Sequence, residues 1–196
     1  MSMFGQVHVK NGQYKIKGDF HELTPNMPIR NSDDGWKLMG VTNPRDMTYI
    51  HSYGGESIFF ESLSKGKLMA TRCDNKKCES KGSIYQPFRI FCPDCLSKMT
   101  VIDMTDIAKK TAKIHTFMVC ERSGAFNILK RPIKFINIEF DGVCTILMSY
   151  LAVGEPEIGM RVVPIFQKLD PTYTILDMAW VPEKTKSNHL PKGFSF

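Results

Sequence analysis

Four of the six cysteines lie in two close pairs, and their spacing is typical of a metal site. Cys73 and Cys78 enclose four residues, Cys92 and Cys95 enclose two, and 13 residues separate the pairs. Zinc prefers four thiolate or imidazole ligands at the corners of a tetrahedron, and two short loops that each supply two thiolates satisfy that preference. The sequence therefore predicts one structural zinc ion held by Cys73, Cys78, Cys92 and Cys95.

Other interpretations of the cysteines stay open at this point. An even number of cysteines is typical of disulfides in a secreted protein, but no secretory signal is visible and we expect a cytoplasmic protein. A rubredoxin-like iron site is a second alternative, although its two loops normally enclose two residues each. Four unliganded cysteines are a third. Cys120 and Cys144 fall in apolar segments, where we expect both to be buried.

A site with four thiolate ligands leaves no open position for a substrate or an activated water molecule. We therefore expect the metal to stabilise the fold and to do no chemistry. The sequence contains no GxSxG, HExxH, P-loop or dinucleotide-binding motif. His115 and Cys120 are five residues apart, which on a strand places them on opposite faces, so they do not suit a thiolase nucleophile and its base. These patterns predict no catalytic residue in this chain.

Positive charge gathers around the cysteines. Residues 65–113 contain 11 Lys or Arg and five Asp or Glu, which equals the formal net charge of +6 of the whole chain. Such a segment attracts phosphates, acidic protein surfaces or nucleic acid. Charge alone does not choose among these partners.

The N-terminal segment predicts a β-hairpin followed by an extended arm. Asn11-Gly12 is the dipeptide that a type I′ turn favours, because both central residues take positive φ. This turn places Val9 opposite Tyr14 and Val7 opposite Ile16. Residues 18–55 contain several prolines and glycines and show weak periodicity, so we expect an irregular docking arm to complete a first segment, residues 1–55. Its apolar anchors are Trp36, Leu38, Met39 and Tyr49.

The rest of the chain predicts one short helix, the zinc ribbon and a run of strands. Residues 56–65 place Phe59 and Leu63 on one helix face, with Gly66 as the residue that ends the helix. Asp141-Gly142 predicts a tight hairpin. Strands are expected at 99–104, 114–120, 132–140, 143–151, 160–168 and 173–181. The predicted fold is therefore mainly β, with a helix and zinc ribbon at 56–98, a five-stranded OB-fold barrel at 99–183 and a tail at 184–196.

The stretch from Phe59 to Cys95 resembles a known family. It reads FFESLSKGKLMATRC, then QPFRIFCPDC, with Pro87-Phe88-Arg89 before Cys92-Pro93-Asp94-Cys95. Together with Ile158-Gly159-Met160-Arg161-Val162, these motifs resemble the acyl-CoA-associated family that joins a rubredoxin-like zinc ribbon to an OB fold. The resemblance covers roughly residues 56–182. The first cysteine loop is longer than usual in that family, and so is the N-terminal arm.

The resemblance implies a non-catalytic subunit of a thiolase-type acyl-CoA enzyme complex, with the partner subunit carrying the C–C bond chemistry. An extended member of the family that resembles this chain would be the small zinc-finger subunit of a benzoylsuccinyl-CoA-type thiolase in anaerobic toluene degradation. The implied ligands are one zinc ion and CoA or an acyl-CoA shared with the partner. Four basic residues are candidates for contacts with CoA phosphates: Arg89, Arg122, Lys130 and Arg131.

A nucleic-acid-binding zinc-ribbon/OB module is the alternative function, because both parts bind nucleic acids in other proteins. That function requires exposed aromatic side chains on which bases stack. The candidates are Phe117, Phe135, Phe140, Phe166 and Tyr173. If these side chains fill the interior of the barrel, the subunit hypothesis is favoured.

Overall fold

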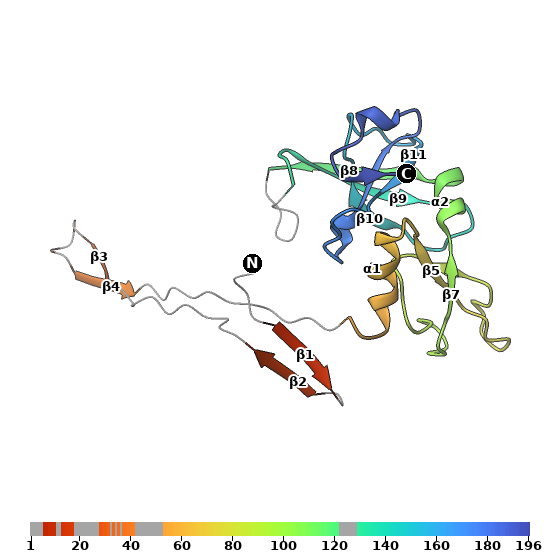
Figure 1. Ribbon diagram of the computed structural model, residues 1–196, viewed down its shortest axis with the longest axis horizontal. Helices are drawn as coiled ribbons and strands as arrows, with labels where there is room; N and C mark the ends of the chain where they lie inside the picture. The colour runs from red at the N-terminus through yellow and green to blue at the C-terminus, as the bar shows by residue number, and fades with distance from the viewer. Residues whose placement is uncertain are drawn as a thin grey trace. The chain divides into compact units, whose positions relative to one another are not determined.

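A computed structural model of the chain describes residues 6–10, 13–17, 28–31, 33, 35, 37–41, 53–121 and 129–196. The chain divides into two compact units, residues 1–52 and 53–196. Among the described residues, the first unit contains four short strands and the second contains both α-helices and the remaining strands (Figure 1).

The predicted N-terminal hairpin is present in the first unit. β1 (Gln6–Lys10) pairs antiparallel with β2 (Gln13–Lys17), with Val9 opposite Tyr14 and Val7 opposite Ile16. This is the register that a two-residue turn at Asn11-Gly12 imposes, although the turn residues themselves lie outside the described residues.

A second hairpin lies in the segment that the sequence predicts to be irregular. β3 (Pro28–Asn31) pairs antiparallel with β4 (Lys37–Val41), and the register shifts between Ile29 and Arg30. The strands are short, one begins with a proline, and the shift breaks the alternation of side chains. These features hide the strands from a search for periodicity. Of the predicted anchors, Leu38 is exposed, and Trp36 and Tyr49 lie outside the described residues.

The second unit begins with the predicted helix. α1 (Ser57–Ser64) buries Phe59 and Leu63, as their spacing of four residues requires. Gly66 follows with a φ of 72°, and its N–H donates to the carbonyl of Leu63. Glycine adopts this left-handed conformation without steric cost, and this ends the helix as predicted.

A three-stranded ribbon follows α1. β5 (Met69–Arg72) is the central strand, with β6 (Ile84–Tyr85) on one side and β7 (Thr100–Asp103) on the other, both antiparallel to it. The two cysteine pairs lie in the loops between these strands, so the ribbon sheet forms the base on which the loops stand.

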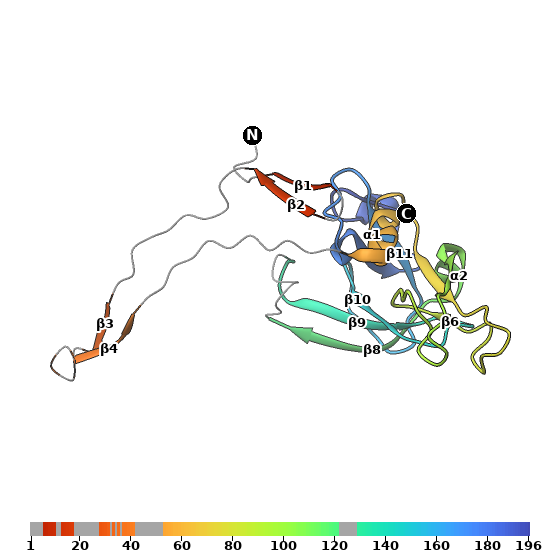
Figure 2. The same cartoon turned by 90° about the horizontal axis from the view of Figure 1, so that it is seen from below.

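Among the described residues, six strands form the OB-type part, in which Figure 2 shows β8, β9 and β10 side by side. One antiparallel sheet contains β8 (Lys113–Cys120), β9 (Ile133–Glu139) and β10 (Leu147–Tyr150). In the other sheet, β11 (Val162–Gln167) pairs antiparallel with β12 (Met178–Pro182) and with β13 (Phe194–Ser195).

Two isolated bridges connect these sheets in the order of an OB fold. Lys113 of β8 pairs antiparallel with Arg161, next to β11, and Leu151 after β10 pairs parallel with Trp180 of β12. The strand order is therefore β8-β9-β10-β12-β11, returning to β8. The mainly β fold is confirmed, but the sheets meet at single bridges and do not close into a continuous barrel.

Two details of the prediction are wrong. A turn forms at Asp141-Gly142, but Leu147 pairs with Ile138, so a wide connection and not the predicted tight hairpin joins β9 to β10. The backbone N–H of Cys144 donates to the carbonyl of Ile84 in the ribbon, which draws this connection away from the sheet. Cys144 is consequently exposed, not buried. The sequence also gave no expectation of α2 (Thr105–Thr111), a short helix between β7 and β8.

The buried apolar residues form two main clusters. The larger contains Leu63 of α1, Leu68 and Phe88 of the ribbon, and Trp180 of β12, so it joins the ribbon to the OB-type strands. The second lies among β9, β11 and β12, and Leu190 and Phe194 of the predicted tail pack against it. The end of the chain therefore packs on the domain from which it comes.

Candidate metal centre

The first cysteine loop starts where β5 ends. Cys73 follows Arg72 directly, its N–H donates to the carbonyl of Ser83, and its carbonyl accepts from Gly82. The N–H of Cys78 donates to the carbonyl of Asn75. The Asn75 side chain accepts from the N–H of Lys77 at 3.0 Å. This local turn takes up the two extra residues of the loop, so both cysteines still face the same interior point.

The second cysteine loop is a narrow hairpin, residues 91–98. Phe91 and Lys98 pair antiparallel, and the N–H of Cys92 donates to the carbonyl of Ser97. The N–H of Leu96 donates to the carbonyl of Cys92, with Leu96 at a φ of 57°. Asn75 Nδ2 donates to Ser97 Oγ at 3.0 Å, and this contact joins the two loops directly.

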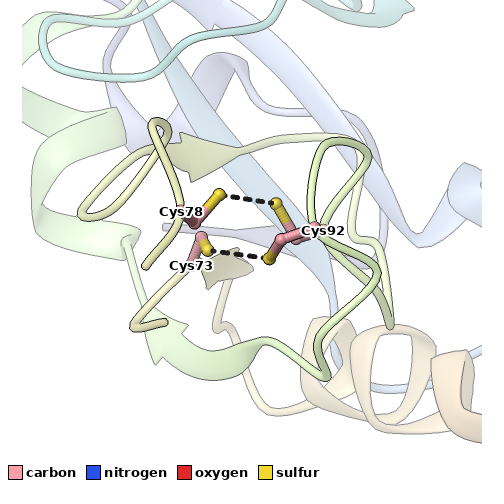
Figure 3. A group of neighbouring side chains, drawn as sticks. Cys73, Cys78 and Cys92 are labelled. Carbon is pink, nitrogen blue, oxygen red and sulfur yellow. Dashed lines mark hydrogen bonds between the residues drawn. The ribbon is translucent and has the colours of Figure 1, made fainter. Parts of the chain in front are cut away.

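The four sulfur atoms lie within 4.8 Å of one another. Cys73 Sγ is 3.8 Å from Cys95 Sγ. Cys78 Sγ is 3.8 Å from Cys92 Sγ, and Figure 3 shows these two side chains and Cys73 pointing toward one another. Zinc bound to sulfur at about 2.3 Å separates two tetrahedral ligands by about 3.8 Å. A disulfide would require about 2.0 Å. The four cysteines could therefore hold one metal ion, and their geometry is not that of two disulfides.

The surroundings of the sulfur atoms favour a cation between them. Cys73 and Cys92 are almost fully buried, and Cys78 is 8% exposed. Burial raises the pKa of the Cys78 thiol to about 12. Hydrogen bonds from the side chain and backbone of Ser97 lower the pKa of the Cys95 thiol to about 6. Buried thiolates require a neighbouring positive charge, which a divalent metal ion supplies.

The metal site forms a small core of its own. The buried cluster around it contains only Tyr85 and Met99 besides three of the cysteines, and Cys95 packs against it. All four sulfur atoms are used as ligands in such a site, so a bound metal would have no open position. The arrangement can stabilise the two loops but offers no place for a substrate to reach the metal.

Two of the four basic residues proposed to bind CoA lie together. Lys130 and Arg131 line a groove of about 520 Å³ on the OB-type part. Arg89 is elsewhere, on the ribbon, with its guanidinium carbon 5.8 Å from the centre of the Tyr85 ring. Arg122 lies outside the described residues.

The groove contains further residues that the sequence did not single out. Its lining includes Lys134 and Tyr150 from β9 and β10, and Pro191 and Phe194 from the end of the chain. The Lys134 ammonium group also forms an ion pair with the Glu155 carboxylate. Side chains alternate between the two faces of a strand, so the sequence of β9 could have predicted Lys134 on the same face as Pro132, which also lines the groove. No sequence pattern indicates that residues 191–194 return to this surface.

The aromatic residues considered for base stacking are mostly inside. Phe135, Phe140 and Phe166 are buried, which leaves Phe117 and Tyr173 exposed. His115 Nδ1 lies 2.9 Å from Glu139 Oε2 on the surface and pairs with that carboxylate. The buried aromatics fill the space between the sheets, so they do not provide the stacking surface that the nucleic-acid alternative requires.

No protein-family model and no curated protein matches the chain. One similar solved structure is a chain of the "Ltp2-ChsH2(DUF35) aldolase", with 21% identity, a TM-score of 0.52, and coverage of 69% of this chain and 98% of that one. Another is a DUF35 family protein of unknown function from Sulfolobus solfataricus, with 21% identity, a TM-score of 0.47, and coverage of 67% and 89%. The first shows a shared fold. Among the described residues, no helix has the length and apolar character to cross a membrane.

Proposed function

We propose that this chain is a non-catalytic subunit of a thiolase-type acyl-CoA enzyme complex, with one structural zinc ion on Cys73, Cys78, Cys92 and Cys95. The observation that carries the proposal is the closed four-sulfur site on a ribbon that is joined to OB-type strands by a common core. The same fold occurs in a chain of a complex described as an aldolase, an enzyme that also acts on C–C bonds. In this proposal the partner supplies the nucleophile and base, and both proteins work in the cytoplasm.

The division of labour follows the segments predicted from the sequence. Residues 1–55 form the docking arm, and residues 56–98 hold the metal. Residues 99–183, with the tail at 184–196, provide the groove. The proposed reaction of the complex is thiolysis of an acyl-CoA, with benzoylsuccinyl-CoA in anaerobic toluene degradation as the specific candidate.

The groove is the proposed site of contact with CoA. Lys130 and Arg131 are exposed beside an apolar floor that includes Ile133 and Leu151. Cations of this kind bind phosphate, and an apolar surface suits the rest of the CoA chain. Arg89 and Arg122 are further candidates for contacts with CoA, at positions where the partner subunit would complete the site.

The test of this function is purification of the chain from its native host with identification of the protein that accompanies it. We expect a thiolase-type subunit, and we expect the pair to cleave benzoylsuccinyl-CoA in the presence of CoA. A complex with a nucleic-acid enzyme, or tight binding of single-stranded oligonucleotide by the purified chain, would contradict the proposal.

The contribution of the groove is tested separately by calorimetric titration of CoA into the assembled complex. A Lys130→Ala/Arg131→Ala variant should bind CoA at least about tenfold more weakly, because two charge-assisted hydrogen bonds are worth more than 1.4 kcal/mol together. Lys184→Ala/Lys186→Ala removes two exposed cations outside the groove and serves as the matched control. Equal CoA affinities in the two variants would remove the groove from the proposal.

A further inference from the structure

Leu96 has a backbone conformation that leucine rarely adopts. Its φ is 57°, in the left-handed region that favours glycine, and among the described residues only Tyr173 is a second non-glycine residue with positive φ. The side chain gains little from the fold in return, because Leu96 is 75% exposed and belongs to none of the buried clusters. A glycine would suit this turn better. Strained residues of this kind gather at functional sites, where the strain is retained for what the side chain does.

A second apolar side chain is exposed on the hairpin that carries Leu96. Phe91 is 56% exposed and pairs directly opposite Lys98, so these two side chains lie on one face of the hairpin. Cys92, the next residue, points to the other face and is fully buried among the sulfur atoms. The hairpin therefore holds its thiolate inside and presents apolar side chains outside. We refer to Phe91, Leu96 and Lys98 as the knuckle tip.

Lysines surround the knuckle tip. The bond from Asn75 to Ser97 holds the first cysteine loop, with the exposed Lys76 and Lys77, against the hairpin that carries Lys98. Within the described part of the chain, none of these three lysines forms an ion pair.

The carboxylates in and beside the two loops offset these three lysines only in part. Asp74 pairs with Arg72, whereas Asp94, which accepts a hydrogen bond from Ser80, and the exposed Glu79 keep their negative charge. The knuckle tip is therefore an apolar projection with an excess of positive charge beside it.

We propose that the knuckle tip inserts into an apolar pocket rimmed by carboxylates on the partner enzyme subunit. This inference rests on the proposed function, because it requires a partner protein. Leu96 and Phe91 are the apolar anchors, and the lysines match acidic groups at the rim and steer the encounter. Two side chains are too few to anchor a protein to a lipid surface, where binding grows with buried apolar area, so a protein pocket is the occupant that fits.

Leu96→Gly is the informative substitution, because its effects on folding and on docking have opposite signs. Glycine relieves the backbone, so the variant should retain one zinc ion per chain and a melting temperature equal to or above that of the wild type. It also removes the apolar anchor. Affinity for the purified partner subunit, measured by biolayer interferometry, should fall about 10- to 100-fold, the equivalent of burying one leucine side chain.

Three further variants complete the experiment. Phe91→Ala should weaken partner binding by a similar factor, and Lys98→Glu should slow association in a way that added salt diminishes. Leu169→Gly is the matched control, since Leu169 is 87% exposed but lies outside the ribbon. It should bind the partner as the wild type does.

The outcomes separate this inference from the function on which it rests. If the wild-type chain forms no complex with a thiolase-type subunit, both fail. If the complex forms but Leu96→Gly and Phe91→Ala bind within about twofold of the wild type, the difference is below 0.5 kcal/mol and only the knuckle tip proposal is overturned. Loss of zinc from Leu96→Gly would show that the residue serves folding. Binding of the wild type to phosphatidylserine vesicles that is lost in this variant would show that the residue contacts a membrane. Either result overturns the proposal.

Discussion

Removal of the metal should unfold the two cysteine loops while the rest of residues 53–196 stays folded. The perturbation is Cys92→Ser, at a side chain that is fully buried with its sulfur 3.8 Å from that of Cys78. Serine oxygen is a poor zinc ligand beside three thiolates. The loops have their own small core, separate from the two clusters that hold the OB-type strands together, so the loss should remain local.

The expected loss of local stability depends on the other interactions that hold the two cysteine loops in place. Besides the cysteines, their buried cluster contains only Tyr85 and Met99. Burial of two such side chains contributes about 3–6 kcal/mol, whereas a structural zinc site contributes about 10–16 kcal/mol at neutral pH. The metal is therefore the larger of the two contributions. Without the metal, the rate at which trypsin cleaves the loops should rise at least about 100-fold. A 100-fold rise corresponds to a loss of less than 3 kcal/mol in the free energy of local opening.

Limited proteolysis measures this opening directly. Lys76 and Lys77 are exposed trypsin sites within the first cysteine loop, and Lys81 is another site three residues after Cys78. Mass spectrometry should show rapid cleavage there in Cys92→Ser, and in the wild type treated with a strong chelator. The more distant sites at Lys184 and Lys186 should be cut at unchanged rates.

Cys144→Ser is the control, because Cys144 is exposed and lies outside the cluster of sulfur atoms. It should retain about one zinc per chain by elemental analysis and the wild-type cleavage rate. The reasoning is refuted if Cys92→Ser and Cys73→Ser both keep a full equivalent of zinc in the presence of chelator. It is also refuted if the loops stay protected after the metal is gone.

Three other outcomes are expected. The isolated chain should not cleave acyl-CoA with CoA in a spectrophotometric assay, and turnover without a partner would contradict the proposed division of labour. Burial, with the nearby Asp177 carboxylate, raises the pKa of Tyr150, so the folded state keeps a proton that the unfolded state loses. The free energy of unfolding should thus fall as pH rises above about 10, and Tyr150→Phe should flatten that fall in urea titrations. Deletion of residues 1–52 should leave a chain that folds and binds zinc, since the second unit has its own cores, but that no longer co-purifies with its partner.

The elements that could be predicted are those with strong local signals. Asn11-Gly12 fixes the register of β1 and β2, and Phe59 with Leu63 marks the buried face of α1. The OB-type strands are runs of apolar residues, and the larger cluster buries residues of both sheets in one interior. In each case the residues that form the signal also make the contacts that stabilise the element.

Elements that depend on distant contacts could not be predicted. The wide connection between β9 and β10 exists because Cys144 and Thr145 bond to Ile84 and Gln86 in the ribbon, about 60 residues earlier. The tight turn at Asp141-Gly142 does form, with the Val143 N–H donating to the Phe140 carbonyl, but these tertiary contacts prevent β10 from pairing with β9 directly after it. The short α2 has only seven residues and one buried side chain, Ala108, so it carries almost no periodic signal.

The candidate metal site was visible in the sequence for a different reason. Metal ligands must converge on one point, and the short spacing within each cysteine pair ensures that convergence before any tertiary contact is known. The residue that joins the two loops, Asn75, gave no such signal, because its bond to Ser97 spans 22 residues. Leu96 could have been singled out only by comparing its position with the glycine that a left-handed turn prefers.

In the proposed function, the chain acts through its surfaces. A four-sulfur site excludes substrate from the metal, so the ribbon contributes rigidity. Rigidity matters at the knuckle tip, because an apolar anchor held in one conformation loses little entropy when it enters a pocket. The large core then transmits that fixed position to the OB-type strands and their groove. In the proposed function, such a subunit would assist catalysis by holding a partner and its CoA ester in register, with a metal that stabilises the ribbon and does not react.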